Sequence, residues 1–277
     1  MRSSIFVAAL FLSSAACFGQ TAPQQPAAGT QQASQARPDT QATAVAKGTQ
    51  ENDPDYGAKF LDCYRLLDAL AGKILAKLHS DVELIFLSDH GFTTLKNEVY
   101  VNVWLEQNGF LSFDGREKSL GSMSPQTKAF ALDPGRIYVN LAGREPKGTV
   151  APEEQQEVVG RLATELKKMQ DPDSGESMIG DVYLADEIYI GPQRNRAPDL
   201  LIMGRDGYDV KGTMEAGELT GRGKLVGMHK YDNATLFVRG KRIEVEHASV
   251  RDVLPTACVL LGLEPPSDLD GRSVIKG

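Results

Sequence analysis

Cysteine, tryptophan and histidine are scarce in this sequence of 277 residues, which has three, one and four of them respectively. Three cysteines exclude the class of small, disulfide-dense secreted domains. Acidic residues outnumber basic ones by 37 to 30, so the formal net charge of −7 excludes a histone-like basic binder. We therefore expect no nucleic-acid partner. The chain is long enough to build one sizeable hydrophobic core or two small ones.

Apolar runs long enough to cross a bilayer are also absent, so we expect no transmembrane helix. The apolar run at residues 5–16 follows Arg2 and ends in small residues, which is typical of a secretory signal peptide spanning residues 1–19. Cleavage after Gly19 predicts an exported protein, periplasmic or extracellular. Residues 14–17 also form an imperfect lipobox, so a lipid anchor on Cys17 is one alternative, and a segment that stays uncleaved is another.

Residues 20–50 consist mainly of glutamine, alanine and threonine. Such a segment cannot bury enough apolar surface to offset its ordering entropy, so we interpret it as a disordered tether. Residues 51–277 then form the folded part. Cys63 and Cys258 could pair in an oxidising compartment, but each lies in an apolar helical stretch, where cysteine is more often a small buried hydrophobe.

The hydrophobic pattern of the folded part alternates between helix and strand. Three- and four-residue spacing predicts a helix over 58–78, and a continuous apolar run predicts a buried strand of the parallel type over 82–87. Residues 152–169 are expected to be helical because Pro152 and two glutamates suit a first helical turn. We expect further strands at 136–141, 200–203 and 234–238 and a helix at 250–261, and we expect the glycine-rich segment at 204–228 to be mostly loop. This order indicates an α/β fold.

The dipeptide Asp89–His90 lies where the 82–87 strand should end, at the edge where α/β sheets bind ligands. A carboxylate beside an imidazole suits zinc, manganese or iron. The alternative is that Asp89 caps a turn before Gly91 while His90 packs or is solvated. His229 follows the glycine-rich loop and could reach the same crevice, although a lone loop histidine is more often a surface residue. We assign His79 and His247 to structural or solvent-exposed positions.

Several stretches resemble a known family in the family's own order. They include Leu87-Ser88-Asp89-His90-Gly91-Phe92 and the segments at 64–68, 101–111, 136–145, 187–192, 197–200 and 252–272. On these residues the chain resembles the C-terminal half of the type I phosphodiesterase and nucleotide pyrophosphatase group. This group belongs to the alkaline phosphatase superfamily, and the likeness is greatest to its predicted phosphohydrolase and phosphomutase branch. The resemblance implies a three-layer α/β/α sandwich that is alkaline-phosphatase-like and incomplete.

The resemblance also implies a metal site. In that superfamily two divalent cations hold a phosphoryl group. By resemblance Asp89 and His90 would be ligands of the metal that holds the nucleophile, and His229 a ligand of the second metal. The family further uses an earlier aspartate, a threonine or serine nucleophile and an Asp-x-x-x-His pair. The signal peptide and the tether stand where the first two should be, and no histidine precedes His79. We therefore expect a partial site that binds zinc or manganese weakly, and we identify no catalytic residue.

Three functional hypotheses follow. The first is an exported phosphohydrolase or phosphodiesterase-like protein that lacks the nucleophile half and is inactive as a lone chain. The second is an active phosphoric-ester hydrolase, completed by a partner chain or in a homodimer and acting on a phosphorylated small molecule. The third is a non-catalytic, tethered binding module. We also expect the strand at Val82 to show an uncovered edge, because the family builds its sheet from both halves.

Overall fold

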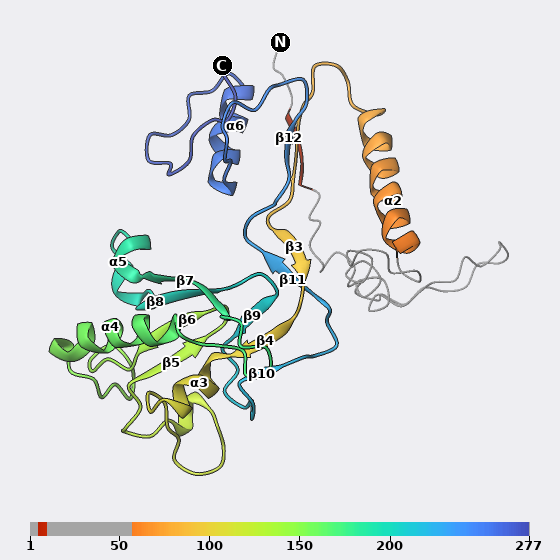
Figure 1. Ribbon diagram of the computed structural model, residues 1–277. Helices are drawn as coiled ribbons and strands as arrows, with labels where there is room; N and C mark the ends of the chain where they lie inside the picture. Colours follow the sequence, from red (N-terminus) through yellow and green to blue (C-terminus); the bar gives the residue numbers. More distant parts are fainter. Residues whose placement is uncertain (1–4, 10–56, 277) are drawn as a thin grey trace, which may run out of the picture. The chain divides into compact units, whose positions relative to one another are not determined.

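The computed structural model describes residues 5–9 and 57–276 (Figure 1). Most of the predicted signal peptide and all of the predicted tether lie outside these residues. The chain divides into two compact units, of which the first comprises residues 1–94 and 229–277 and the second residues 95–228. No helix among the described residues combines the length and the apolar character that a bilayer crossing requires.

The first unit is built around the strand β2, Glu83–Leu87. It pairs in parallel with β1, Ile5–Ala9, and antiparallel with β12, Leu236–Val238. Leu84 and Ile85 in its centre are buried, as the continuous apolar run predicts. The expected uncovered edge at this strand is wrong for the described structure, because a segment from the N-terminus occupies it.

Two helices accompany this sheet. Helix α2, Gly57–Leu75, confirms the helix predicted from the three- and four-residue spacing. Near the C-terminus the short turn η5, Val250–Asp252, leads into α6, Val253–Leu260. Asp252 anchors this end of the chain, because its carboxylate accepts the backbone N–H groups of Ser249 and Arg272 at 2.8 and 2.9 Å. No disulfide joins Cys63 to Cys258.

The second unit contains two sheets. The larger has the order β5-β6-β8-β7, with all neighbours antiparallel, and the smaller has the order β10-β4-β9. The strands β3 and β11 form a separate two-stranded sheet. The bounds of these strands are β3 Gly91–Thr94, β4 Asn97–Tyr100, β5 Ala129–Leu132, β6 Arg136–Val139, β7 Ile179–Leu184, β8 Leu200–Gly204, β9 Tyr208–Lys211, β10 Thr220–Gly221 and β11 Gly227–Lys230.

Short helices complete the second unit. They are α3 Val101–Gln107, η2 Leu120–Ser122, η3 Pro152–Glu154, α4 Gln155–Leu166, α5 Ala185–Ile188 and η4 Arg194–Arg196. The helix predicted at 152–169 is therefore present, with its first turn tightened to a 3₁₀ turn at Pro152. The segment at 204–228, which we expected to be mostly loop, is mostly loop, but β9, β10 and the start of β11 lie within it. Glycines there hid the short strands, since glycine ordinarily marks a loop.

The two units differ in how well they are packed. The second has a continuous core of buried side chains that includes Trp104, Phe110, Ile137, Leu162 and Leu200. In the first unit the buried hydrophobic side chains among the described residues are few: Leu84, Ile85, Val238, Val274 and Ile275. Side chains of α2 remain largely exposed, with Leu66 at 70% and Tyr64 at 54%. The first unit therefore depends more on backbone pairing than on a hydrophobic core.

A buried ion pair joins the strands of the second unit. Asp199, which is 3% exposed, accepts two hydrogen bonds from the Arg144 guanidinium, at 2.6 and 3.2 Å. It also accepts the backbone N–H of Val139 at 2.7 Å and the Gln155 side-chain amide at 2.7 Å. The carboxylate thus fixes the end of β6 to the start of β8 and to α4. Leaving such a carboxylate without its partners costs several kcal/mol, on the order of 3 to 5, because its charge is shielded from water.

We expect Asp199→Asn to lower the free energy of unfolding of the second unit by about 3 kcal/mol, because an amide nitrogen would face the buried arginine. Trp104 is the single tryptophan and is buried in this unit, so its fluorescence during denaturant unfolding reports the loss. The control is Asp186→Asn, which removes an ion pair to Arg194 from a carboxylate that is 75% exposed. It should cost no more than about 0.5 kcal/mol. Equal effects of both variants would contradict the structural role of Asp199.

A second buried carboxylate makes the stability of this unit depend on pH. Burial by itself raises the pKa of Asp171, but the backbone N–H groups of Asp173 and Ser174 and the Asn97 side chain hold the pKa below its ordinary value. A lowered pKa in the folded state stabilises the protein above the ordinary pKa of about 4. This stabilisation is lost as the pH falls through the folded-state pKa.

We expect Asp171→Ala to lower the free energy of unfolding at neutral pH by about 1–3 kcal/mol, because several donors lose their acceptor. The difference from the wild type should begin to shrink as the pH falls below about 4 and should be lost once the pH has passed the lowered folded-state pKa, because the wild-type carboxylate is then also protonated. Trp104 fluorescence in denaturant, measured at several pH values, checks this. Exposed Asp173→Ala is the control, since only its backbone contacts Asp171. A pH-independent difference would contradict the assignment.

Candidate functional site

The Asp89–His90 pair lies directly after β2. The β2–β12 pairing extends up to it, because the backbone N–H of Ser88 donates to Thr235 O at 2.9 Å and the N–H of Thr235 donates to Ser88 Oγ at 2.8 Å. The chain then turns and enters β3 at Gly91. Its partner strand β11 carries His229. The turn after β2 and the pairing of β3 with β11 therefore place Asp89 and His90 close to His229, which lies far along the chain.

The two histidines of the prediction lie side by side. The ring centroids of His90 and His229 are 4.0 Å apart, and the ring planes are inclined by 34°. The His90 side chain is 19% exposed, whereas His229 is exposed. The structure thus brings together two imidazoles that the sequence separates by the whole second unit.

Hydrogen bonding determines which nitrogen of His90 carries a proton. Its Nδ1 lies 2.8 Å from the carbonyl oxygen of Gly91, which can only accept, so Nδ1 is the donor. In the neutral ring Nε2 then carries a lone pair, and it lies 3.5 Å from Asp89 Oδ1. A backbone carbonyl on the other ring nitrogen is the usual arrangement of a metal-binding histidine.

The described residues do not contain a preformed metal cluster, however. Among residues 5–9 and 57–276 no three His, Cys, Asp or Glu side chains have the spacing to hold an ion together. The Asp89 side chain is 39% exposed. The assignment of Asp89, His90 and His229 as metal ligands therefore stays a prediction. An apolar cavity beside α2 and a polar one around Lys96, Glu176 and Tyr208 are lined by none of these three residues.

The other two histidines lie at exposed positions. His79 follows α2, and its backbone carbonyl accepts the N–H of Val82 at 3.2 Å. The His247 side chain is 91% exposed and lies 4.0 Å from Glu246. Both therefore stay outside the candidate site.

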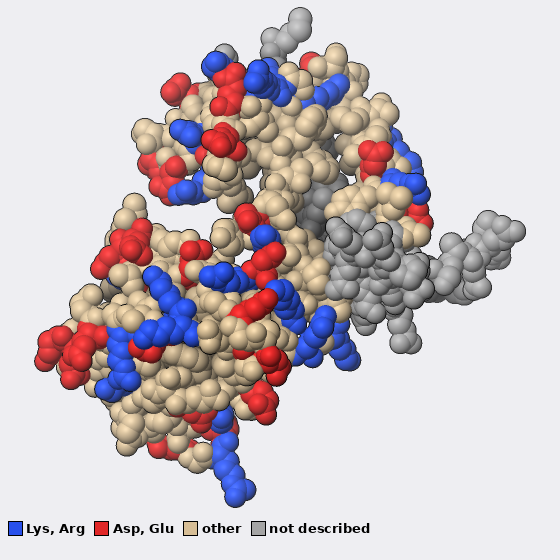
Figure 2. All heavy atoms as spheres, in the orientation of Figure 1, with Lys and Arg blue, Asp and Glu red and all other residues tan. Residues whose placement is uncertain are grey.

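Charged residues of both signs are interspersed on the face of the molecule drawn in Figure 2.

Sequence reasoning missed the turn that packs against the candidate site. The Asn233 side chain and the backbone carbonyl of Asp232 lie so close to Gly91 that any Cβ there would overlap with them. Asn233 itself has a positive φ of 56°. The Asp-Asn dipeptide after β11 is a turn signal, because asparagine tolerates the left-handed region. Position 91 therefore requires a residue without a side chain, and glycine allows the backbone after His90 to pack directly against this turn.

We expect Gly91→Ala to destabilise the first unit by on the order of 2 kcal/mol, because the turn at Asn233 must shift to admit a methyl group. Amide hydrogen exchange of β2 and β3 measures this. The matched control is Gly72→Ala in the middle of α2, where a Cβ would meet nothing within 4 Å. It should stabilise the helix by about 0.5–1 kcal/mol. Unchanged exchange in the Gly91 variant would show that the turn is not packed against this glycine.

A family assignment follows from comparison with known proteins. The family model "Type I phosphodiesterase / nucleotide pyrophosphatase" matches residues 36–232, which is well over half of the chain. The chain therefore belongs to the type I phosphodiesterase and nucleotide pyrophosphatase family. This confirms the resemblance drawn from Ser88-Asp89-His90-Gly91 and the accompanying stretches. It also agrees with the alkaline-phosphatase-like α/β fold, incomplete in this chain, that the resemblance implies.

Solved structures similar to the chain carry names from the same family. Murine ectonucleotide pyrophosphatase/phosphodiesterase 5, an inactive variant in complex with AMP, is 19% identical with a TM-score of 0.43. A second structure of the murine protein is 18% identical with a TM-score of 0.42, and the human protein is 15% identical with a TM-score of 0.42. The matches cover 82% of this chain but only 54–55% of the solved chains. The chain thus spans about half the length of these proteins. Among curated proteins no sequence matches.

Proposed function

We propose that the chain is the metal-binding part of a phosphoester hydrolase, in which Asp89, His90 and His229 hold a divalent cation. The observation that carries the proposal is the contact of the His90 and His229 rings at the end of β2, in a chain that belongs to a family of phosphodiesterases and pyrophosphatases. The sequence separates these two histidines widely, and the pairing of β3 with β11 brings them together at the polar end of β2, where α/β sheets commonly bind ligands.

The residues at this site fit a borderline metal such as zinc or manganese. Two imidazoles and one carboxylate are a donor set that both ions accept. The hydrogen bond from His90 Nδ1 to Gly91 O supports a ring whose Nε2 is available as a ligand. A cation bound here would supply Lewis-acid polarisation of a phosphoryl oxygen. The chain's own contribution is to orient the His90 ring and to present Asp89 beside it.

The chain by itself is proposed to be inactive. We identify no nucleophile among its residues, and three ligands are too few to neutralise and hold two cations tightly. A single, weakly bound ion is the expected state. Turnover would then require a complementing chain or a homodimer that supplies the missing groups, and a phosphorylated small molecule is the proposed substrate class.

Export is a further part of the proposal. It rests on the signal-peptide pattern of residues 1–19, and the lipobox-like residues 14–17 make a lipid anchor at Cys17 its alternative. A non-catalytic, tethered binding module would share this location, but it would not need the contact between His90 and His229.

Metal binding tests the site directly. We expect the full chain to bind zinc or manganese with one equivalent, and His90→Ala and His229→Ala each to weaken binding at least about tenfold, because each removes a ligand. Isothermal titration calorimetry, with the metal ion titrated into each protein and no other ligand present, gives the affinity. His247→Ala is the matched control, since this histidine is exposed outside the site. Equal affinity in all four proteins would overturn the ligand assignment.

Hydrolysis of a chromogenic phosphodiester tests the proposed inactivity. We expect no turnover by the purified full chain with zinc or manganese, because we identify no nucleophile from its sequence. Turnover that is lost in His90→Ala would contradict this and would make the metal site catalytic in the lone chain. Turnover that persists in His90→Ala would come from another source.

A further inference from the structure

The two edges of β2 are occupied by strands of very different origin. One edge carries β12, whose position is fixed by backbone hydrogen bonds such as Ser88 N to Thr235 O and Arg239 N to Leu84 O, both 2.9 Å. The other edge carries the five residues of β1, Ile5–Ala9, in register with β2 from Glu83 to Leu87 (Figure 1). This strand belongs to the same apolar run that has the pattern of a removable signal peptide.

The hydrogen bonds to β12 also determine which backbone groups of β2 face β1. The backbone groups of Leu84 and Ser88 face β12. Because these groups alternate along a strand, those of Phe86 face β12 as well, whereas those of Ile85 and Leu87 face β1. Removal of β1 would leave the N–H groups of Ile85 and Leu87 without their strand partners.

The same alternation assigns the groups on β1. In a parallel ladder one residue bonds to the two residues that flank its partner. Ala8 is the partner of Phe86, whose own groups face β12, so the N–H and C=O of Ala8 point to β2. Val7 is the partner of Ile85, and its N–H and C=O point away from β2. Two adjacent residues therefore have opposite roles in this pairing.

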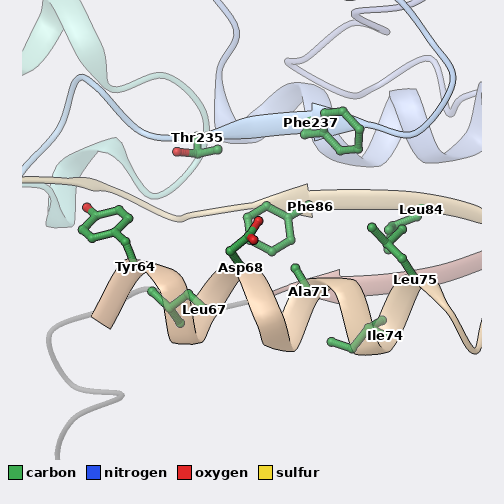
Figure 3. Close-up of a pocket in the computed structure, with 10 residues that line it drawn as sticks. All are labelled: Tyr64, Leu67, Asp68, Ala71, Ile74, Leu75, Leu84, Phe86, Thr235 and Phe237. Atoms are coloured by element: carbon green, nitrogen blue, oxygen red, sulfur yellow. The ribbon is translucent and has the colours of Figure 1, made fainter. Parts of the chain in front are cut away.

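The unit around β2 has little core to compensate for a lost strand. A cavity of about 370 Å³ separates α2 from the sheet, with Leu67 and Leu75 of α2 on one side and Leu84, Phe86 and Phe237 of the two strands on the other (Figure 3). Phe237 is 50% exposed. Burial against α2 is thus incomplete, and the hydrogen bonds of both neighbouring strands carry much of the order of β2.

We propose that the free edge of β2 is a strand-acceptor site. The chain's own segment Ile5–Ala9 fills it in cis, and once that segment is removed it takes an extended apolar strand from a second polypeptide. Addition of a strand to an exposed edge is driven by main-chain hydrogen bonds, which are satisfied by any strand of suitable length. The seated segment is parallel to β2, five residues long and apolar, so we expect the second polypeptide to supply a strand with the same properties.

The direction of the acceptor site links it to the candidate metal site. Ala9 is in register with Leu87, so a strand seated in parallel ends at the edge where Asp89 and His90 follow β2. The residues that come next in such a strand are delivered to that edge. The seated residues 5–9 of this sequence are Ile, Phe, Val, Ala and Ala, which include neither a metal ligand nor a nucleophile. The segment Ile5–Ala9 therefore completes the sheet but adds no functional group to the candidate metal site.

A pair of proline variants tests the seating in cis. The full chain is made by cell-free translation without membranes, so that its N-terminal segment stays attached. Ala8→Pro removes an N–H that points to β2, whereas the matched control Val7→Pro removes one that points away, which an edge strand tolerates. We expect amide exchange at Ile85 and Leu87 to accelerate at least tenfold in Ala8→Pro but not in Val7→Pro. Exchange at Phe86, which faces β12, should change less.

Replacement of the N-terminal segment by a separate peptide tests the acceptor site itself. A protease site placed within residues 20–50 of the full chain allows the N-terminal fragment to be cut free after folding. We expect the fragment to co-elute with the remainder on size exclusion and to be displaced by an excess of a labelled peptide of residues 3–11 flanked by lysines. The same peptide with Ala8→Pro should not bind.

Two results would overturn the proposal. Equal exchange at Ile85 and Leu87 in the two proline variants would show that β1 does not pair with β2. Failure of the wild-type peptide to bind the cut chain, with the fragment lost, would show that the edge accepts no strand in trans. Neither readout involves metal or turnover, so the outcome is independent of the proposed function.

Discussion

The backbone pairing of β2 on both edges is the constraint on which the candidate site depends. One neighbour comes from the N-terminal apolar segment and the other from residues 236–238. The second pairing continues through Ser88 and Thr235, and it thereby determines where β2 ends and where Asp89 and His90 begin. Few side chains are buried around this strand, so hydrogen bonds rather than hydrophobic contacts hold the site in place.

The second unit is stabilised in a different way. Its hydrophobic core is continuous, and the buried Asp199 carboxylate joins two strands and a helix through Arg144, Val139 and Gln155. A unit with this core and this ion pair has an internal source of stability. The unit that carries the candidate site has no comparable one in the described residues. This contrast is what is expected where a domain depends on an additional strand or chain to complete its packing.

The sequence predicts the regular elements well where burial and periodicity agree. Helix α2, strand β2 and the helix that starts at Pro152 are found within a few residues of the expected positions. The short strands within 204–228 were not predicted, because glycines there mask a pattern that only pairing with other strands makes regular. The pairing of residues 5–9 with β2 could not be predicted either, since the same apolar run is equally typical of a signal peptide.

For the candidate site, the sequence by itself determined which residues are available: four histidines, of which one follows an apolar strand directly after an aspartate. His229 was a further candidate by its position after the glycine-rich segment, and the likeness to the family implied that it is a metal ligand. Tertiary structure alone decided that the His229 ring lies against His90, because β3 and β11 pair although the second unit separates them in the chain. It also decided that Gly91 must lack a side chain, because the turn at Asn233 occupies the space. Both results come from contacts between distant segments, which local sequence patterns do not encode.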